Sequence, residues 1–182
     1  MSAPLRARSG RPQAGEFADY ARTDIDQVEG DDAVEALAAQ ERATRKLLEP
    51  RTEGEVAGLR YAPGKWTLKE VLGHLADDER IYAYRALCVA RGEPLPLPGF
   101  DEKLYVASAD FETRSLADLL NEYRSVRGAT ITLLSGLPRE AWERKGEVNG
   151  YVASVRGLAF HIAGHELRHV RALREKYLGL LK

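Results

Sequence analysis

Three histidines near the C-terminus follow one another at intervals of four residues: His161, His165 and His169. Four residues are slightly more than one helical turn, so in a helix the three imidazoles lie along one stripe. The one remaining histidine, His74, lies in a distant amphipathic segment. Imidazole nitrogens are common ligands of transition-metal ions. A metal site is therefore the first hypothesis that the sequence suggests.

Hydrophobic periodicity and capping residues predict four helices that would position these histidines. The predicted helices run over about residues 31–50, 67–91, 115–136 and 154–177. Thr67 and Glu70 have the spacing of a capping box at the start of the second helix, and Gly92 is suited to end it. Residues 51–66 are predicted to form a loop. Residues 93–114 are predicted to form a long connection that begins extended and rigid because its prolines alternate. No segment indicates a strand or an internal repeat.

The composition is typical of one globular domain. The chain has 182 residues, 44% of them hydrophobic, and a net charge of −1, which argues against nucleic-acid binding through bulk phosphate attraction. Cys88 is the only cysteine, so an intramolecular disulfide is excluded. No apolar run approaches the roughly 20 residues of a membrane span, and the basic N-terminus lacks the apolar core of a signal peptide. We expect a cytoplasmic protein without membrane or nucleic-acid partners. In it, residues 1–15 form a flexible arm that contributes nothing to the fold, and residues 16–182 form one helical domain.

The length of the connection over residues 93–114 predicts the order of the helices. The second helix is roughly 37 Å long, and a connection of about 22 residues can span that length. The second and third helices can then run parallel, which gives an all-α four-helix bundle of up-down-down-up topology. This order brings His74 to the level of His165 and His169. Loop residues at the same end become candidates for a pocket: Tyr61, Trp66, Phe100, Asp101 and Tyr105.

Several stretches, in this order along the chain, together resemble the DinB-like family. They are YAPGKWTLKEVLGHLADDER, RALCVARG, LPGFD and GHELRH, and the resemblance spans roughly residues 20–178. It implies an up-down-down-up four-helix bundle, commonly a homodimer, with a divalent metal held by three histidines. The corresponding residues of this chain are His74, His165 and His169. Relatives include S-transferases that use bacillithiol, mycothiol or glutathione, and many members without an established activity.

The chain departs from the pattern of the better-known thiol transferases at two positions. Arg168 stands where those enzymes often have a second histidine directly before the last ligand, and Ala172 stands where a glutamine often follows. The three predicted ligands are intact. The pocket chemistry of those transferases therefore cannot be carried over to this chain.

The segment from His165 to His169 also matches the H-E-x-x-H pattern of zinc peptidases, in which the glutamate is the general base. Such enzymes take their third ligand from downstream, and only 13 residues without a histidine follow His169. The sequence therefore argues against a peptidase. Glu166 could still activate a metal-bound water, but the expected role is that of a solvated helical residue. His161 is expected to pack beside the site rather than to supply a fourth ligand.

Two further readings concern the helix that carries His74. Asp78, four residues later, could orient that imidazole as a carboxylate behind the ligand, a common arrangement. Asp77, Asp78 and Glu79 could equally form a solvated face. Cys88 has no neighbouring base in the sequence and is expected to be a small core residue.

The leading hypothesis is an enzyme that depends on a divalent metal, Zn²⁺, Ni²⁺ or Fe²⁺, and acts on a small molecule. The metal would polarise a substrate or lower the pKa of a thiol or water, so thiol S-transfer, with a low-molecular-weight thiol as second cofactor, and hydrolysis both fit. The competing hypothesis is a stress-related metal-binding or interaction protein, without catalysis, whose ion only stabilises the bundle. No catalytic residue beyond the ligands is assigned, and the homodimer rests on the family resemblance.

Overall fold

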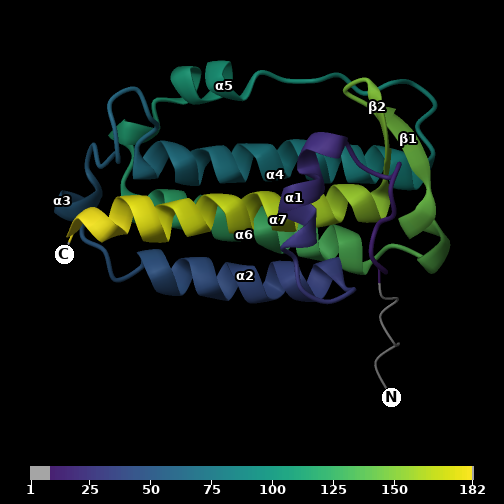
Figure 1. Cartoon of the computed structure of the whole chain (residues 1–182), viewed down its shortest axis with the longest axis horizontal. Coiled ribbons are helices and arrows are strands. Elements are labelled where there is room, and N and C mark those ends of the chain that lie inside the picture. Colours follow the sequence, from purple (N-terminus) through teal and green to yellow (C-terminus); the bar gives the residue numbers. More distant parts are fainter. Residues whose placement is uncertain (1–8, 182) are drawn as a thin grey trace.

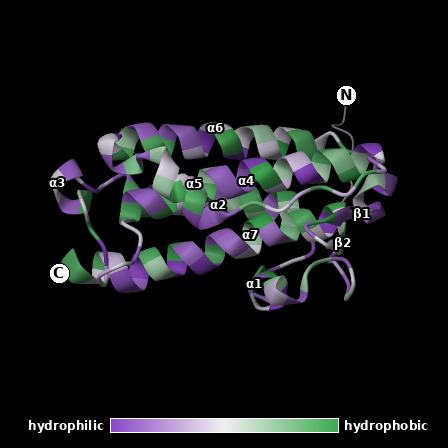
Figure 2. Ribbon diagram, turned by 90° about the horizontal axis from the view of Figure 1, so that it is seen from above, coloured by the Kyte–Doolittle hydropathy of each residue, from purple (hydrophilic) through white to green (hydrophobic). Residues whose placement is uncertain are grey.

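The computed structural model describes residues 9–181, in which four long helices pack side by side (Figure 1). These helices are α2 (Ala33–Leu48), α4 (Leu68–Arg91), α6 (Leu116–Ser135) and α7 (Val155–Ala172). Each is amphipathic, with hydrophilic and hydrophobic residues sharing its turns (Figure 2). The predicted all-α four-helix bundle is therefore confirmed. Across residues 9–181, no helix is both long and apolar enough to cross a membrane.

The helices begin and end where local hydrogen bonding satisfies their free backbone groups. Thr67, Ser115 and Ser154 each accept a hydrogen bond from the backbone amide three residues later, and these three residues lie at the predicted helix starts. Asp32 caps α2 in the same manner, one residue after the predicted start. Gly92 ends α4 in the left-handed conformation at φ 80°, which a residue without Cβ adopts without strain.

The directions of the helices are consistent with the predicted order. Lys69, in the first turn of α4, donates hydrogen bonds to the carbonyl oxygens of Glu112 and Arg114, which directly precede α6. The starts of α4 and α6 therefore lie together, and the two helices run parallel. Figure 1 shows α2 and α7 running the opposite way, with the C-terminus beside the start of α4.

The connections contain more structure than the sequence indicated. Their helical segments are η1 (Asp19–Ala21), α1 (Arg22–Asp26), α3 (Glu53–Val56), α5 (Glu102–Ala109), η2 (Phe111–Thr113) and η3 (Arg139–Glu143). The end of α7 continues into a π-helical turn (Leu173–Tyr177) and a 3-10 turn, η5 (Leu178–Leu181). The long connection between α4 and α6 is present, and α5 lies along the outside of α4 within it (Figure 1).

The expectation of no strand was wrong. Strands β1 (Lys145–Val148) and β2 (Tyr151–Ser154) form an antiparallel hairpin in which Val148 faces Tyr151. Asn149 and Gly150 make its two-residue turn at φ 50° and 80°, the conformation that favours an Asn-Gly pair. The strands are only four residues long, too short for their alternation to be recognised. The proline-rich segment after α4 is extended, as predicted, and Leu97 pairs with this hairpin.

Residues 9–15 contribute to the fold, in contrast to the expected flexible arm. The Ser9 hydroxyl accepts a hydrogen bond from the amide of Ala33 at the start of α2. The Arg11 guanidinium donates to the carbonyl oxygens of Ile25, Val28 and Gly30. These contacts fasten the chain before α1 to the bundle. Residues 1–8 of the predicted arm lie outside the described residues, and the division of the chain at residue 15 stays a prediction.

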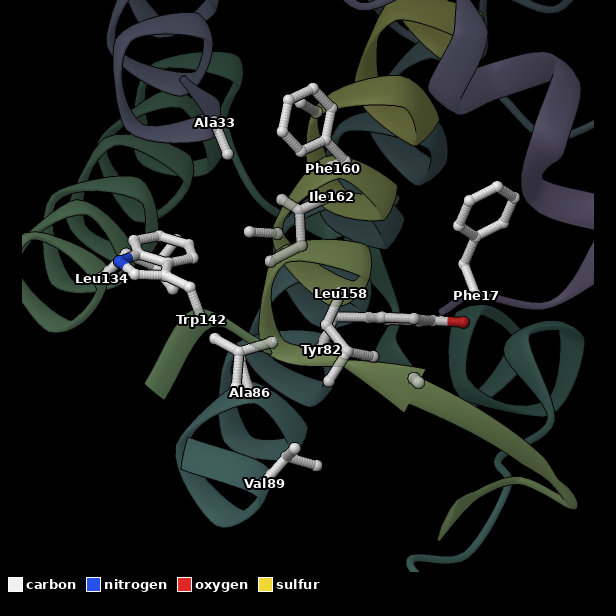
Figure 3. Close-up of a cluster of buried hydrophobic side chains, with 14 of the residues drawn as sticks. Phe17, Ala33, Tyr82, Ala86, Val89, Leu134, Trp142, Leu158, Phe160 and Ile162 are labelled. Carbon is white, nitrogen blue, oxygen red and sulfur yellow. The ribbon is translucent and has the colours of Figure 1, made fainter. Parts of the chain in front are cut away.

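The apolar interior has two parts, one at each end of the bundle. In the part shown in Figure 3, Leu158, Phe160 and Ile162 of α7 pack with Trp142, which follows α6, and with Tyr82 of α4. The other part contains the ends of α2 and α7 and the starts of α4 and α6.

Between the two apolar parts lies a buried network of charged and polar groups. Arg127 of α6 is only 1% exposed and pairs with Glu79 of α4 at 2.8 Å and with Glu166 of α7 at 2.5 Å. Its guanidinium also donates to the carbonyl of Leu37 in α2 at 2.9 Å. Glu166 further accepts hydrogen bonds from Thr44 of α2 and from a tyrosine of α6. One guanidinium thus binds groups from the three other helices.

Substitution of Glu166 with Gln tests this network. The change keeps the size of the side chain but leaves the buried positive charge of Arg127 with one carboxylate instead of two. We expect the free energy of unfolding to fall by about 3 kcal/mol, because removing one partner of a buried ion pair is costly. Urea unfolding of the metal-free protein measures the change. Glu175→Gln, at an exposed position after α7, is the control and should stay within about 0.5 kcal/mol of the parent. Equal stability of the Glu166→Gln variant and the parent would contradict the structural role of the network.

Candidate metal centre

The structure brings three of the four histidines together. His74 comes from the second turn of α4, and His165 and His169 come from successive turns of α7. One ligand atom from each of the three lies within 4.8 Å of the others, and the Nε2 atoms of His74 and His165 are 3.1 Å apart. His74 and His165 are buried and His169 is half-buried. These are the three residues that the sequence predicted as ligands.

Burial keeps these imidazoles neutral, which is the form that binds a metal. Loss of hydration lowers the pKa of His74 to about 4 and the pKa of His169 to about 3, and the positive charge of Arg168 adds to both effects. The pKa of His165 lies well below its usual value because of its burial and the three neighbouring histidines. At neutral pH, each ring therefore offers a nitrogen lone pair.

Asp78 lies behind this group of histidines. Its Oδ2 atom is 3.3 Å from Nδ1 of His165, but the contact lacks hydrogen-bond geometry, so this buried oxygen has no hydrogen-bond partner among residues 9–181. Burial raises the pKa of Asp78 to about 8. A cation held by the histidines would favour the ionised carboxylate. The convergent neutral nitrogens and this orphaned oxygen together fit a divalent metal ion.

The structure corrects the interpretation of residues 77–79. The carboxylate of Asp78 contacts His165 of the opposite helix and not His74, and it is buried rather than solvated. Glu79 is buried in the ion pair with Arg127. Asp77 is half-buried and contacts an arginine of its own helix. Hydrophobic periodicity could not show this, because each carboxylate meets its partner only through tertiary packing.

Glu166 is neither solvated nor directed at the histidines. It is 2% exposed, and both of its carboxylate oxygens are engaged by the buried network around Arg127. The glutamate of the H-E-x-x-H pattern is therefore a structural residue in this chain. It cannot serve as the base that the peptidase reading requires.

His161 and Cys88 lie where the sequence suggested. The His161 ring stacks on Tyr82 with centroids 3.8 Å apart and is 5.8 Å from the His165 ring. It does not belong to the group of three convergent histidines. Cys88 is half-buried and packs against the apolar interior shown in Figure 3.

Two cavities flank the histidines. The larger one, of about 740 Å³, is bordered by His169 and by Tyr61 and Trp66 of the loop before α4. The smaller one, of about 350 Å³, is bordered by His165 and Phe100. Glu102 of α5 and Arg168 of α7 line both. The candidate centre therefore lies between two spaces that could each receive a small molecule.

Three of the five predicted pocket residues line these cavities, namely Tyr61, Trp66 and Phe100. Asp101 lines neither, because its carboxylate caps α5 by accepting hydrogen bonds from two backbone amides. Tyr105 is 44% exposed and packs its ring on Phe100 at 5.3 Å. The unexpected helix α5 accounts for both positions.

Several residues of the smaller cavity were not foreseen from the sequence. They are Tyr20, Tyr82, Arg85, Glu102 and Asn149. The sequence did contain a pattern that could have indicated Tyr82 and Arg85. Both continue, at helical spacing, the stripe on α4 that contains His74 and Asp78. Nothing in the sequence indicated that Tyr20 would border the cavity. Tyr20 belongs to η1 and reaches the site because the adjoining helix α1 packs on α7. That packing is close, since a Cβ on Gly164 would meet the backbone of Asp24 at 2.5 Å.

With this fold and site in view, comparison with known proteins identifies the class. The sequence model of the DinB superfamily matches residues 36–173, and the chain belongs to that superfamily. The structure is similar to that of YfiT from Bacillus subtilis, described as a probable metal-dependent hydrolase with an unusual four-helix bundle topology. The two have a TM-score of 0.68 and 18% sequence identity, and the similarity covers 91% of this chain and 90% of YfiT. No curated protein matches the sequence.

Metal content tests the site. We expect near-stoichiometric divalent metal in the purified, tag-free protein and almost none in a His165→Ala variant, because a ligand from the centre of the group is lost. His161→Gln is the matched control, one turn away on the same helix, and should keep its metal. Elemental analysis of all three proteins makes the comparison. Equal metal content in the parent and the His165→Ala variant would exclude His165 as a ligand.

The lowered histidine pKa values predict how the metal-free protein responds to acid. Below pH 6.5 the unfolded chain binds a proton at His169, whereas the folded protein does not until about pH 3. Acid therefore favours the unfolded state, with a slope of about 1.4 kcal/mol per pH unit for this group. Asp78, whose pKa is raised, opposes this trend, so the parent must be compared with a variant.

His169→Gln isolates the contribution of that histidine. Urea unfolding between pH 6.5 and about 4 should show the parent losing stability more steeply than the variant, by about 1.4 kcal/mol per pH unit. Identical slopes for the two proteins would show that His169 is not held neutral by burial.

Proposed function

We propose that this chain is a divalent-metal-dependent enzyme that acts on a small molecule, either as a hydrolase or as a thiol S-transferase. The observation that carries the proposal is the convergence of His74, His165 and His169 between two cavities. The description of YfiT as a probable metal-dependent hydrolase supports the first reaction.

The number of ligands favours catalysis over a purely structural ion. Within the part of the chain that the structure describes, the group contains three imidazoles and no carboxylate or thiolate. Structural zinc sites are usually closed by four protein ligands, whereas catalytic sites keep a position for water or substrate. Zn²⁺, Ni²⁺ and Fe²⁺ all accept imidazole ligands. Such an ion would supply Lewis acidity, which polarises a substrate and lowers the pKa of a nucleophile.

The chain's own residues would hold and orient the reactants. Asp78 lies behind His165, where its carboxylate, ionised beside a bound cation, would stabilise the positive charge of the centre. Glu102 is exposed and lines both cavities, so it brings a carboxylate to the walls of the spaces where the reactants would bind. Trp66, whose ring lies 4.8 Å from that of His74, shields the centre on the side of the larger cavity.

Thiol S-transfer is the second candidate, and the two cavities favour it. A transferase must hold a thiol and an electrophile together, and each cavity borders a different histidine. Hydrolysis needs only one organic substrate. The competing non-catalytic proposal, a stress-related metal-binding or interaction protein, does not require a coordination position open to small molecules. The homodimer and the cytoplasmic location stay predictions.

Activity assays on the metal-loaded protein test the proposal. We expect the parent either to consume a low-molecular-weight thiol in the presence of an electrophile or to hydrolyse members of an ester and amide panel. His165→Ala should lower that rate by more than about 100-fold, because changes even to the partners of metal ligands cost about 10- to 100-fold. Cys88→Ser should keep the parental rate, which excludes the one cysteine as the nucleophile.

Ligand exchange at the metal distinguishes the enzyme from the non-catalytic alternative. Azide or a small thiol should change the visible spectrum of the Co²⁺-substituted parent if a coordination position is open. An unchanged spectrum together with no activity on either panel would favour an ion that only stabilises the bundle.

A further inference from the structure

Arg85 is a buried cation without an ion-pair partner. Its side chain belongs to α4, is 2% exposed and lines the smaller cavity. One guanidinium nitrogen, Nη2, donates a hydrogen bond to the carbonyl of Pro98 at 2.7 Å. Within residues 9–181, no other hydrogen bond engages the guanidinium and no carboxylate lies within ion-pair distance of it. Arginine is almost never fully buried unless it is paired.

Arg127, which is also fully buried, shows which partners Arg85 lacks. Arg127 has two carboxylate partners and a backbone carbonyl, so most of its donors are used. Arg85 instead lies over the rings of Tyr82 and Phe100, at 4.8 and 5.7 Å from their centroids. These rings hold the guanidinium in place and leave its remaining donors free. A buried cation with free donors on a cavity wall is suited to bind an anion from solution.

The distance from Arg85 to the histidines determines whether one ligand can contact both. Asp78 marks the level of His165 on α4, and Arg85 follows seven residues later, roughly 10 Å along the helix axis. Both residues and His165 line the same cavity of about 350 Å³. A ligand bound at Arg85 can therefore extend along the cavity toward the candidate metal centre.

We propose that Arg85 binds the carboxylate of a small organic acid in this cavity. A planar guanidinium matches a carboxylate through two parallel hydrogen bonds. The rings of Tyr20, Tyr82 and Phe100 border the cavity and suit the apolar body of the acid. The reaction of this acid at the histidines rests on the proposed function, whereas its binding at Arg85 does not.

The other charges of the cavity favour a singly charged acid. Arg168 is engaged by Asp24 at 2.8 Å, so it is not a free cation. Arg85 therefore supplies the one positive charge without an ion-pair partner among the described residues that line this cavity, which matches a monoanion. Glu102 on α5 brings negative charge to the same wall and would repel a dianion such as a phosphate monoester more strongly than a carboxylate. The uncharged amide of Asn149 supplies a further polar group that does not alter this balance.

Calorimetric titration with matched probes tests the inference. The probes are 3-phenylpropanoate, its uncharged amide and phenyl phosphate, each added to the metal-loaded protein. We expect the carboxylate to bind at least about tenfold more tightly than the amide, because only the carboxylate forms charge-assisted hydrogen bonds. In the His165→Ala variant, which is expected to hold almost no metal that would attract a dianion, the carboxylate should also bind more tightly than phenyl phosphate. Tighter binding of the phosphate in that variant would overturn the assignment to carboxylates.

Substitutions locate the binding on Arg85. Arg85→Met should weaken carboxylate binding by about 10- to 100-fold and leave amide binding unchanged. Arg85→Lys keeps the charge but not the planar fork, so it should give an intermediate affinity. Arg91→Gln, at an exposed position on the same helix, is the control with parental affinity. Circular dichroism checks that each variant is folded, and the lysine variant alone still tests the proposal if the methionine variant is not.

A His165→Ala variant separates this inference from the proposed function. Carboxylate binding that survives in this variant and is lost in Arg85→Met supports a site at Arg85, even if the parent holds no metal. Binding that is lost in His165→Ala and kept in Arg85→Met would show that the carboxylate binds the metal instead, and would overturn the proposal.

Discussion

The buried ion-pair network around Arg127 is the constraint on which the geometry of this bundle depends. A charged group removed from water is stable only when its partners are correctly placed. Here those partners come from α2, α4 and α7, so any sliding or rotation of one helix would leave a charge unpaired. Apolar packing alone would tolerate such shifts better. We infer that the network sets the register of the four helices.

This register places the candidate metal ligands. Glu166 directs its side chain into the network, and each residue of a helix is rotated by about 100° from the one before it. His165, its neighbour, therefore faces another side of α7, and His169 lies one turn further along that side. There they meet His74 of α4. The glutamate of the H-E-x-x-H pattern thus contributes to the site by holding its helix in place.

The site carries an electrostatic cost that a metal ion would offset. Burial holds the histidines neutral and leaves Oδ2 of Asp78 without a hydrogen bond among residues 9–181. In the metal-free protein these polar groups have lost water without gaining full partners. A divalent ion would engage the nitrogen lone pairs and stabilise the carboxylate behind them. The burial that destabilises these groups in the metal-free protein therefore favours the binding of a cation.

The sequence predicted much of this architecture, since its strongest signals are local. Caps such as Thr67 and Ser154 act within one helical turn, and the four-residue spacing of His165 and His169 fixes their common face. The features that the sequence did not predict depend on tertiary packing. Glu166 resembled a solvated residue because its partners lie on other helices, and Tyr20 reaches the cavity only because α1 docks on α7. Arg85 followed the stripe of His74, but its burial without a carboxylate could be seen only in the structure.

X-ray absorption spectroscopy at the edge of the bound metal tests the central claim, that three neutral histidines form a metal centre. The spectrum of the parent should show nitrogen or oxygen neighbours with the scattering pattern of three imidazole rings, and a His169→Ala variant should show two. A spectrum without imidazole scattering, or one that is the same in the parent and the His169→Ala variant, would contradict the account.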